Sequence, residues 1–346
     1  MNTHEYYMEQ CLALARKGAG RVSPNPMVGS LLVYKERIIG QGYHEHYGEG
    51  HAEVNCIASV KPEDLALIPL STLYVSLEPC SHTGKTPPCT DLILTHQIKK
   101  VLVACTDISS KVNGKGIAQL KEHDVDVTEH ILEKEALELN KRFFTFHTKH
   151  RPYIILKWAQ SKEGFIGIQG ERILLSNAIT NTLVHQWRTE EDVIWVGYNT
   201  LKNDNPQLNV RLVKGKNPVR IVFDNTLNQD LSFHLFDQSR KTILFNTKEN
   251  KEEHNIEWIK VNEEHFTTEI LGSLYSKNYL SVLVEGGTQL LQKLIDKGLW
   301  DEARCIQTAT SLTSGIKAPL LSNHEQISLI KSGDDLIRFY KNAILR

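Results

Sequence analysis

The chain has 346 residues, of which 40 % are hydrophobic, and 40 Lys and Arg against 41 Asp and Glu leave a formal charge of −1. This length predicts two domains, and the near-neutral charge argues against a broad surface for nucleic acid or an anionic membrane. No apolar run approaches the ~20 residues of a membrane helix, and six cysteines are too few for a disulfide scaffold. The N-terminus carries early acidic residues and no apolar core, so we expect a cytoplasmic enzyme without a signal peptide.

The first half of the chain alternates helical and strand patterns. We expect a helix at 4–18, strands at 27–34 and 37–44, a helix at 51–60, a strand at 72–77, a helix at 88–96, a strand at 100–105, a short helix at 115–122 and a long amphipathic helix at 129–150. Such alternation is typical of a layered α/β domain.

The polar segment 147–152 ends in a proline and predicts a domain boundary, with domains at 1–148 and 149–346. The alternation then begins again. We expect strands at 153–160, 192–197, 219–224, 242–246 and 281–285, and helices at 176–188 and 287–298. The second half should therefore carry a sheet of its own.

Two short segments of the first half carry metal-binding chemistry. His51 and Glu53 form an H-x-E pair, and Cys80 and Cys89 flank a loop that follows a strand. One imidazole and two thiolates suit one Zn²⁺ per chain, with the fourth position left for water, whose pKa zinc lowers from about 15.7 to about 7. Glu53 would then carry the proton from that water to a leaving amine.

Geometry and spacing leave alternatives open. Residues two apart in a helix point about 200° apart, so His51 and Glu53 converge only if a helix N-terminus points at the metal. A lone H-x-E is common by chance, and eight residues separate the cysteines where the nucleobase-deaminase signature has two. A structural zinc site with His82 as fourth ligand is the alternative.

The longer cysteine loop has a known counterpart. The segments SPNPMVG (23–29), HEHYGEGHAE (44–53) and EPCSHTGKTPPC (78–89) resemble the deaminase domain of bifunctional riboflavin-biosynthesis proteins. This resemblance implies a cytidine-deaminase-like three-layer α/β/α domain, with the zinc ligands and the catalytic glutamate as above. It also implies a substrate pocket lined by Asn25, His44, His82 and Lys85, although each of these is equally an ordinary loop residue. A lysine at 85 suits a substrate phosphate as a point charge.

The second half lacks the G-x-G-x-x-G dinucleotide fingerprint. Glu285-Gly286-Gly287-Thr288 lies instead between an apolar strand and an amphipathic helix. Two glycines allow close approach of a ligand, and the helix N-terminus offers free N–H groups to a phosphate. By itself this pattern is more often just a turn.

The segments 151–164, 187–211 and 284–295 resemble the reductase domain of the same family. The resemblance implies a dihydrofolate-reductase-like α/β domain that uses NADPH without a Rossmann motif. The positions that match its NADP contacts are Ala159, Leu174, Thr200, Asp204, Gly287, Thr288, Gln289, Leu290, Leu291, Gln292 and Lys293. The positions assigned to the substrate are Arg172, Arg188, Leu208, Arg211 and Glu285. Guanidinium groups suit a phosphate because they bind it bidentately.

This half also departs from the family pattern. Ser161-Lys162-Glu163-Gly164 replaces a usual S-L-D-G stretch, and Arg172 and Leu174 stand where the family commonly has Ser and Trp. The change puts some substrate and nicotinamide contacts in doubt, and with them the efficiency of reduction. No general acid for the hydride step is evident.

The resemblance thus implies a bifunctional enzyme that deaminates a phosphorylated diaminopyrimidine and then reduces its ribosyl group with NADPH. Its partner is a small-molecule substrate, with no nucleic acid and no membrane, and we expect a homo-oligomer. Three alternatives are a deaminase that edits bases in nucleic acid, a monofunctional deaminase whose C-terminal half binds substrate but reduces poorly, and a non-enzymatic zinc-binding interaction protein.

Overall fold

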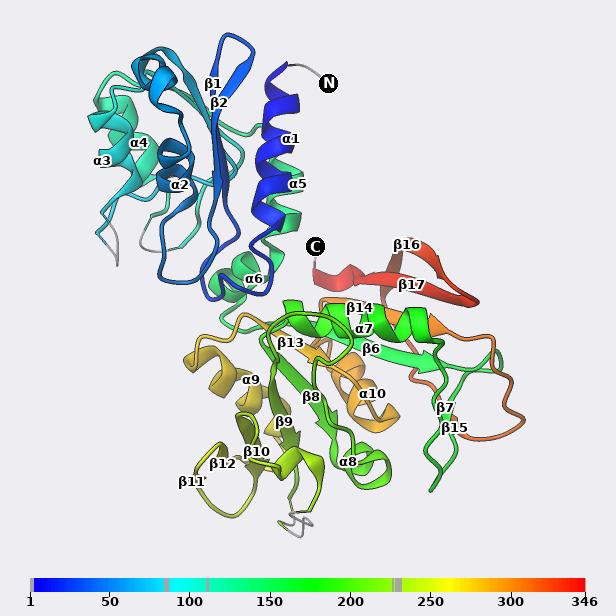
Figure 1. The fold of residues 1–346 in the computed structure, drawn as a ribbon. Coiled ribbons are helices and arrows are strands. Elements are labelled where there is room, and N and C mark those ends of the chain that lie inside the picture. The colour runs from blue at the N-terminus through cyan, green and yellow to red at the C-terminus, as the bar shows by residue number, and fades with distance from the viewer. Residues whose placement is uncertain (1–2, 84–86, 110–111, 226, 228–231, 346) are drawn as a thin grey trace. The chain divides into compact units, whose positions relative to one another are not determined.

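The computed structural model describes residues 3–83, 87–109, 112–225, 227 and 232–345. The chain divides into two compact units, Met1–Lys149 and His150–Arg346, and each is built around a β-sheet of its own (Figure 1). Among the described residues, no helix has the length and apolar content needed to cross a membrane.

The first unit contains a five-stranded sheet in the order β2-β1-β3-β4-β5. β1 runs antiparallel to both of its neighbours, whereas β3, β4 and β5 are parallel. The tight turn between β1 and β2 places Lys35 and Glu36 at φ 46° and 48°, which closes the hairpin in the way that two-residue loops favour. The strands are β1 (Gly29–Tyr34), β2 (Arg37–Tyr43), β3 (Thr72–Val75), β4 (Lys100–Val103) and β5 (Asp126–Thr128).

Helices cover both faces of this sheet and give it three layers. Helices α1 and α5 lie on one face, and α2, α3 and α4 lie on the other (Figure 1). The helices are α1 (Thr3–Arg16), α2 (Ala52–Ala58), α3 (Cys89–Thr95), α4 (Lys115–Glu122), α5 (Glu133–Leu139) and α6 (Lys141–Lys149), with a 3₁₀ segment at Pro62–Leu70.

The single long helix predicted at 129–150 is wrong, because the chain forms two helices there, α5 and α6, which meet at Asn140. The Asn140 side chain donates a hydrogen bond to the carbonyl oxygen of Met27 (2.9 Å) and accepts one from the Met27 amide (2.8 Å). This pairing with a residue 113 positions away favours a break that the local pattern does not reveal.

The second unit contains a ten-stranded sheet in the order β11-β12-β10-β9-β8-β13-β6-β14-β17-β16. The strands from β12 to β14 in this order are parallel, and antiparallel strands flank them at both edges. The strands are β6 (Tyr153–Gln160), β8 (Val193–Gly197), β9 (Val219–Phe223), β10 (Thr242–Asn246), β11 (Lys251–Glu253), β12 (Ile256–Lys260), β13 (Ser281–Val284), β14 (Glu302–Gln307), β16 (His324–Ser332) and β17 (Asp335–Asn342), with a separate pair β7 (Phe165–Gly167) and β15 (Ile316–Lys317).

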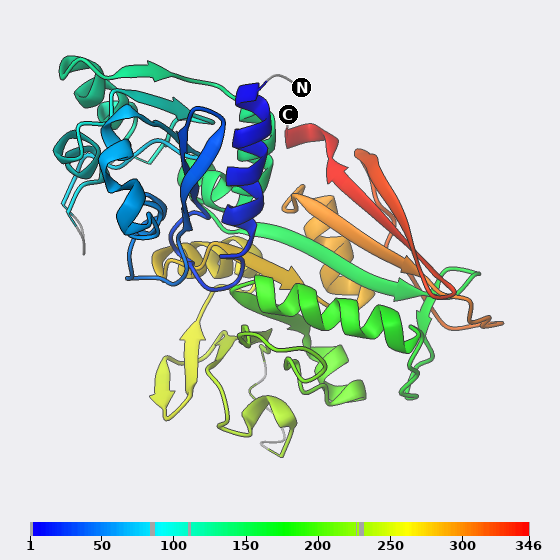
Figure 2. The ribbon, with the colours of Figure 1, turned by 45° about the horizontal axis from the view of Figure 1, so that its top comes forward.

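Alternating side chains of the parallel strands face two different helix layers. Trp195, like Ile154 and Val284, packs in the cluster that contains α9 (Phe266–Ser276) and α10 (Thr288–Asp296). Ile155 and Leu283 pack with α7 (Ala178–Glu190), and α8 (Tyr198–Asp204) packs beside Ile194 on that same face (Figure 2). Burial on both faces explains why these strands read as continuous apolar runs in the sequence.

Candidate active sites

His51, Cys80 and Cys89 meet in the first unit. His51 Nδ1 lies 3.5 Å from Cys80 Sγ and 3.3 Å from Cys89 Sγ, and all three ligand atoms lie within 4.8 Å of one another. One imidazole and two thiols at these distances fit a single Zn²⁺ ion. His82 does not join this group, so the arrangement does not support the four-ligand structural site.

The local backbone explains how these side chains converge. His51 is the N-cap of α2, with an extended backbone (φ −71°, ψ 167°), and Glu53 lies in the first helical turn, so the helix approaches the ligand set end-on. Cys89 begins α3 directly after Pro88, and its N–H donates to Cys80 Sγ (3.4 Å). The N-terminal ends of two helices therefore meet at the ligand set.

The site is electrostatically unusual. Burial raises the pKa of Glu53, and the nearby Cys80 raises it further, to about 7. Hydrogen bonds from Cys89 and His51 lower the pKa of Cys80, and the proximity of Cys80 raises that of Cys89. The pair thus favours loss of a thiol proton, which gives the thiolate form that binds metals, beside a carboxyl group suited to exchange protons near neutral pH.

Asn25 and His44 extend the site beyond the ligands. His44 Nδ1 donates to the carbonyl oxygen of Gly50 (3.0 Å), which leaves Nε2 to accept from Asn25 Nδ2 (3.1 Å). Burial lowers the pKa of His44, in keeping with a neutral ring, and this ring lies edge-on to that of His51, with centroids 5.5 Å apart. Two of the predicted substrate residues therefore lie beside the metal ligands.

Of the other two predicted pocket residues, His82 has a buried Nδ1 without a hydrogen-bond partner, and Lys85 lies outside the described residues. Burial raises the pKa of Asp107, whereas hydrogen bonds from Ser109 and the charges of His147 and His82 oppose that rise. A buried ring nitrogen without a hydrogen-bond partner is available to a ligand.

A cleft of about 1210 Å³ opens in the second unit. It lies at the carboxyl ends of β6, β8, β9 and β13, where β13 has inserted between β6 and β8. This is the position at which open α/β sheets bind ligands. The predicted residues that line it are Ala159, Arg172, Leu174, Arg188, Thr200, Asp204, Leu208, Arg211, Glu285, Gly287, Thr288, Gln289, Leu290, Leu291 and Lys293. Gln292 is not among the lining residues, and its side chain binds Asp296 and Leu320 instead.

Arg188 and Glu285 bind each other in this cleft. Arg188 Nε and Nη2 lie 2.7 and 2.8 Å from the two Glu285 oxygens, and Nη1 donates to the carbonyl oxygen of Asn209 (3.0 Å). Lys157, which sequence reasoning missed, also reaches Glu285, with its Nζ at 3.4 Å. All three side chains are at most 15 % exposed. Their three charges form a buried triad that leaves a net charge of +1 on the cleft wall.

This triad predicts a pH dependence of stability. Burial alone would raise the pKa of Glu285, but the charges of Arg188 and Lys157 lower it from 4.5 to about 2. Because the folded-state pKa is the lower one, its stabilisation is complete above pH 4.5 and is lost as the pH falls toward 2, by about 3 kcal/mol. All five tryptophans lie beyond residue 150, so denaturant unfolding followed by their fluorescence reports on this unit. In the Glu285→Gln variant, the free energy of unfolding should fall less steeply between pH 4.5 and 2 than in the parent. An unchanged pH dependence would show that Glu285 is not the group responsible.

The backbone at Arg211 is hydrogen-bonded to a side chain of α7. The Arg211 amide donates to His185 Nδ1 (3.1 Å), and burial, together with the charges of Arg188 and Arg211, lowers the pKa of His185 to about 4. The guanidinium group of Arg211 is exposed, as is Arg172, whose charge acts on both Arg211 and Asp204. Two exposed cationic side chains thus line the cleft and are available to an anion.

The Gly286-Gly287 turn requires both of its glycines. Their φ angles are +147° and +63°, and a Cβ atom at either position would come within 3.1 Å of the Thr200 side chain. The turn therefore lies directly against Thr200 and leads into the N-terminus of α10.

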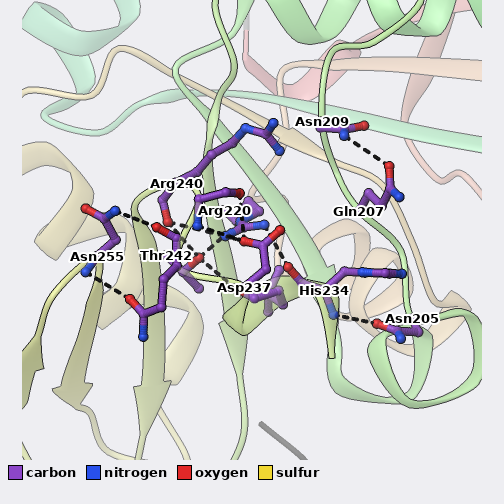
Figure 3. Close-up of polar contacts among 12 residues, drawn as sticks. Asn205, Gln207, Asn209, Arg220, His234, Asp237, Arg240, Thr242 and Asn255 are labelled. Atoms are coloured by element: carbon purple, nitrogen blue, oxygen red, sulfur yellow. Dashed lines mark hydrogen bonds and ion pairs between the residues drawn. The ribbon is translucent and has the colours of Figure 1, made fainter. Parts of the chain in front are cut away.

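A buried arginine, also missed from sequence, supports another wall of the cleft (Figure 3). Arg220 in β9 donates to Thr242 Oγ1 (3.0 Å), to the carbonyl oxygen of His234 (2.9 Å) and to Asp237 Oδ1 (2.9 Å). The His234 amide in turn donates to Asn205 Oδ1 (2.8 Å), and both of these residues line the cleft. Arg220 and its neighbours thus fix the loop that carries His234.

Comparisons with known proteins match both units. A family model described as the cytidine and deoxycytidylate deaminase zinc-binding region matches residues 1–105, and one described as the RibD C-terminal domain matches residues 152–328. The riboflavin biosynthesis protein RibD of Aquifex aeolicus (strain VF5) is 35 % identical, with 97 % of each chain covered. That of Escherichia coli (strain K12) is 31 % identical over 86 % of this chain and 85 % of its own.

Two solved structures are similar to this chain over 98 % of its length. A deaminase/reductase from Thermotoga maritima, which acts on diaminohydroxyphosphoribosylaminopyrimidine and 5-amino-6-(5-phosphoribosylamino)uracil, has a TM-score of 0.90 at 32 % identity and covers 98 % of both chains. Acinetobacter baumannii RibD has a TM-score of 0.88 at 26 % identity, again over 98 % of both chains. The predicted fold class is confirmed, with a cytidine-deaminase-like α/β/α domain followed by an α/β reductase domain.

Proposed function

Because the chain belongs to the RibD family of bifunctional riboflavin-biosynthesis proteins, we propose that it deaminates 2,5-diamino-6-(5-phosphoribosylamino)pyrimidin-4(3H)-one and then reduces the ribosyl group to give 5-amino-6-(5-phosphoribitylamino)uracil. The observation that carries this proposal is the His51, Cys80 and Cys89 set beside Glu53, in one chain with the large cleft. We assign the deaminase to residues 1–148 and the reductase to 149–346. The division of the chain after Lys149 and the extents of the two family matches support this boundary.

In the deaminase, zinc held by His51, Cys80 and Cys89 would make water reactive near neutral pH. Glu53 takes the proton from the attacking water and passes it to the departing amine, a task suited to a buried carboxyl group with a pKa of about 7. Asn25, His44 and His82 orient the pyrimidine, and Lys85 binds its phosphate.

Loss of either cysteine should remove the metal. We expect Cys80→Ser and Cys89→Ser each to fall well below one zinc per chain, because a hydroxyl group is a poorer ligand for zinc than a thiolate. Elemental analysis of the purified variants checks this, with Cys56→Ser, a buried cysteine outside the ligand set, as the control. Full zinc content in both ligand variants would contradict the assignment.

In the reductase, NADPH would supply the hydride for ribosyl C1. The Gly287 turn and the start of α10 would hold its pyrophosphate through backbone N–H groups, with Thr200 and Asp204 as further cofactor contacts. Arg211 and Arg172 bind the substrate phosphate. The Arg188–Glu285–Lys157 triad presents a polar edge to the ribosyl group, and placement of the two ligands supplies much of the rate.

A side chain at the glycine turn should weaken cofactor binding. We expect Gly287→Ala to raise the Kd for NADPH at least about tenfold, because its φ of +63° strains any L-residue and its Cβ would approach Thr200 Oγ1 within 3.0 Å. Calorimetric titration with NADPH and tryptophan-monitored unfolding are measured together. Gly298→Ala is the control, because its φ is +64° but no atom lies within 4 Å of an added Cβ. A folded Gly287→Ala variant with the parent affinity would overturn this cofactor assignment.

The two activities should separate. Chelation of zinc in the full chain is expected to stop ammonia release while NADPH oxidation with the deaminated intermediate continues, because His51, Cys80 and Cys89 form the one candidate metal cluster among the described residues. Loss of both activities, or survival of ammonia release, would contradict the proposal. The monofunctional alternative is not favoured, since the reductase family model matches residues 152–328. The RibD relatives likewise do not favour base editing in nucleic acid or a non-enzymatic zinc protein.

The chain also offers an edge for self-association, and we place the homo-oligomer contact there. β16 is the last strand of its sheet, and eight of its nine residues are exposed, among them Ile327, Leu329 and Ile330. An exposed apolar edge strand can pair with the same strand of a second copy of the chain. Light scattering should show an oligomer that Leu329→Lys disrupts, and a parent monomer would overturn the proposal.

A reducing compartment such as the cytoplasm suits the six free cysteines.

A further inference from the structure

Glu78 is a buried carboxylate that neither proposed reaction uses. It is 4 % exposed and directly precedes Pro79 and the metal ligand Cys80. Its Oε1 accepts hydrogen bonds from the amides of Gly116 (2.9 Å) and Ile117 (3.2 Å), and its Oε2 accepts from those of Asp107 (3.1 Å) and Gly114 (3.0 Å). Four backbone donors therefore point at one side chain.

Only a carboxylate satisfies this arrangement. Each oxygen receives two N–H groups, so both must be acceptors. A glutamine has nearly the same shape, but its amide nitrogen would direct two donors at two further donors, and buried donors left without partners are costly.

The carboxylate joins the metal loop to the chain that follows β4. Gly116, near the start of α4, packs so tightly that a Cβ atom there would lie 1.9 Å from the carbonyl oxygen of Pro79. Thr90 of α3 adds a second connection, since its hydroxyl contacts the carbonyl oxygen of Cys80 (3.3 Å) and Gln119 Oε1 of α4 (3.1 Å). The backbone on both sides of Cys80 is thus fixed by contacts that lead to α4.

We propose that Glu78 is the positioning residue of the metal site: its carboxylate clamps the start of α4 and the amide of Asp107 against the Pro79-Cys80 turn, and so fixes the position of Cys80. This inference rests on the proposed zinc site. The glutamate thereby links the geometry of the Cys80 ligand to the position of α4. The residue does not touch the metal or the substrate.

The test measures metal retention rather than turnover. Glu78→Gln in the full chain should release zinc to a chromogenic chelator about 10–100-fold faster than the parent, the usual effect of losing a group that supports a metal ligand. The cobalt-substituted variant should show a shifted thiolate-to-cobalt absorption band. The milder Thr90→Val, which removes only the hydroxyl contacts, should accelerate release by a smaller factor and tests the link between Cys80 and α4 if Glu78→Gln does not fold.

Leu120→Ala is the matched control, because it opens a cavity in the buried face of α4 and leaves the four hydrogen bonds in place. It should lower Tm without accelerating zinc release to the same extent. Release from Glu78→Gln within twofold of the parent, or equal acceleration in Leu120→Ala at the same loss of Tm, would overturn the role of Glu78. A parent chain that binds no zinc would instead overturn the proposed function.

Discussion

Replacing Glu53 with Gln should reduce ammonia release by about 10²–10⁴-fold, the usual contribution of a general acid–base group. Glutamine keeps the shape of the side chain but cannot take up a proton from water or deliver one to the amine. In the parent, Glu53 is 3 % exposed and its carboxyl group has a pKa of about 7. This group can therefore both take up and deliver a proton near neutral pH.

The measurement compares ammonia release, zinc content and Tm in the same preparation. Zinc should remain at one per chain, since Glu53 is outside the ligand set, and NADPH oxidation with the deaminated intermediate should match the parent and serve as the internal control. Near-normal ammonia release by a zinc-loaded Glu53→Gln would show that another group carries the proton.

Arg188→Met should destabilise the reductase unit by up to about 3–5 kcal/mol, the cost of breaking a buried ion pair, because the buried Glu285 carboxylate then keeps only its longer contact of 3.4 Å to Lys157. The variant loses two contacts of 2.7 and 2.8 Å to Glu285 and one to the carbonyl oxygen of Asn209. The loop that carries Leu208 and Arg211 loses an anchor at the same time, so substrate KM should rise more than the Kd for NADPH.

Tryptophan-monitored denaturation measures this loss. Lys157→Met is the matched control, since it removes a single contact of 3.4 Å to the same carboxylate and should cost less. The Arg188→Met/Glu285→Gln double variant should recover part of the loss. A loss of unfolding free energy below about 1 kcal/mol for Arg188→Met would be typical of a solvent-exposed ion pair. It would show that water reaches the triad more freely than its burial indicates.

The sequence predicted best what depends on residue type and short spacing. His51 and Glu53 lie two residues apart, and Cys80 and Cys89 flank one loop, so the zinc chemistry could be read from two segments. Strands buried on both faces were equally visible, because their apolar runs are continuous.

Contacts between residues far apart in the sequence could not be predicted in this way. The sequence assigns Arg188 and Glu285 each to the substrate, but it does not indicate that they also bind each other across 97 positions. Lys157 and Arg220 lie within apolar strands, where a single charged residue gives no indication of its partner. The break at Asn140 likewise depends on a backbone 113 residues away. These contacts arise from the topology, which periodicity does not encode.

The insertion of β13 between β6 and β8 also orders events during synthesis of the chain. β6 and β8 each pair with β13, so the centre of the sheet stays open until Ser281–Val284 has left the ribosome. The metal ligands, by contrast, span only 38 positions near the start of the chain. The first catalytic centre can therefore mature while the second is still missing its central strand, and a nascent chain that stalls before residue 281 would expose the unpaired sides of β6 and β8 to aggregation.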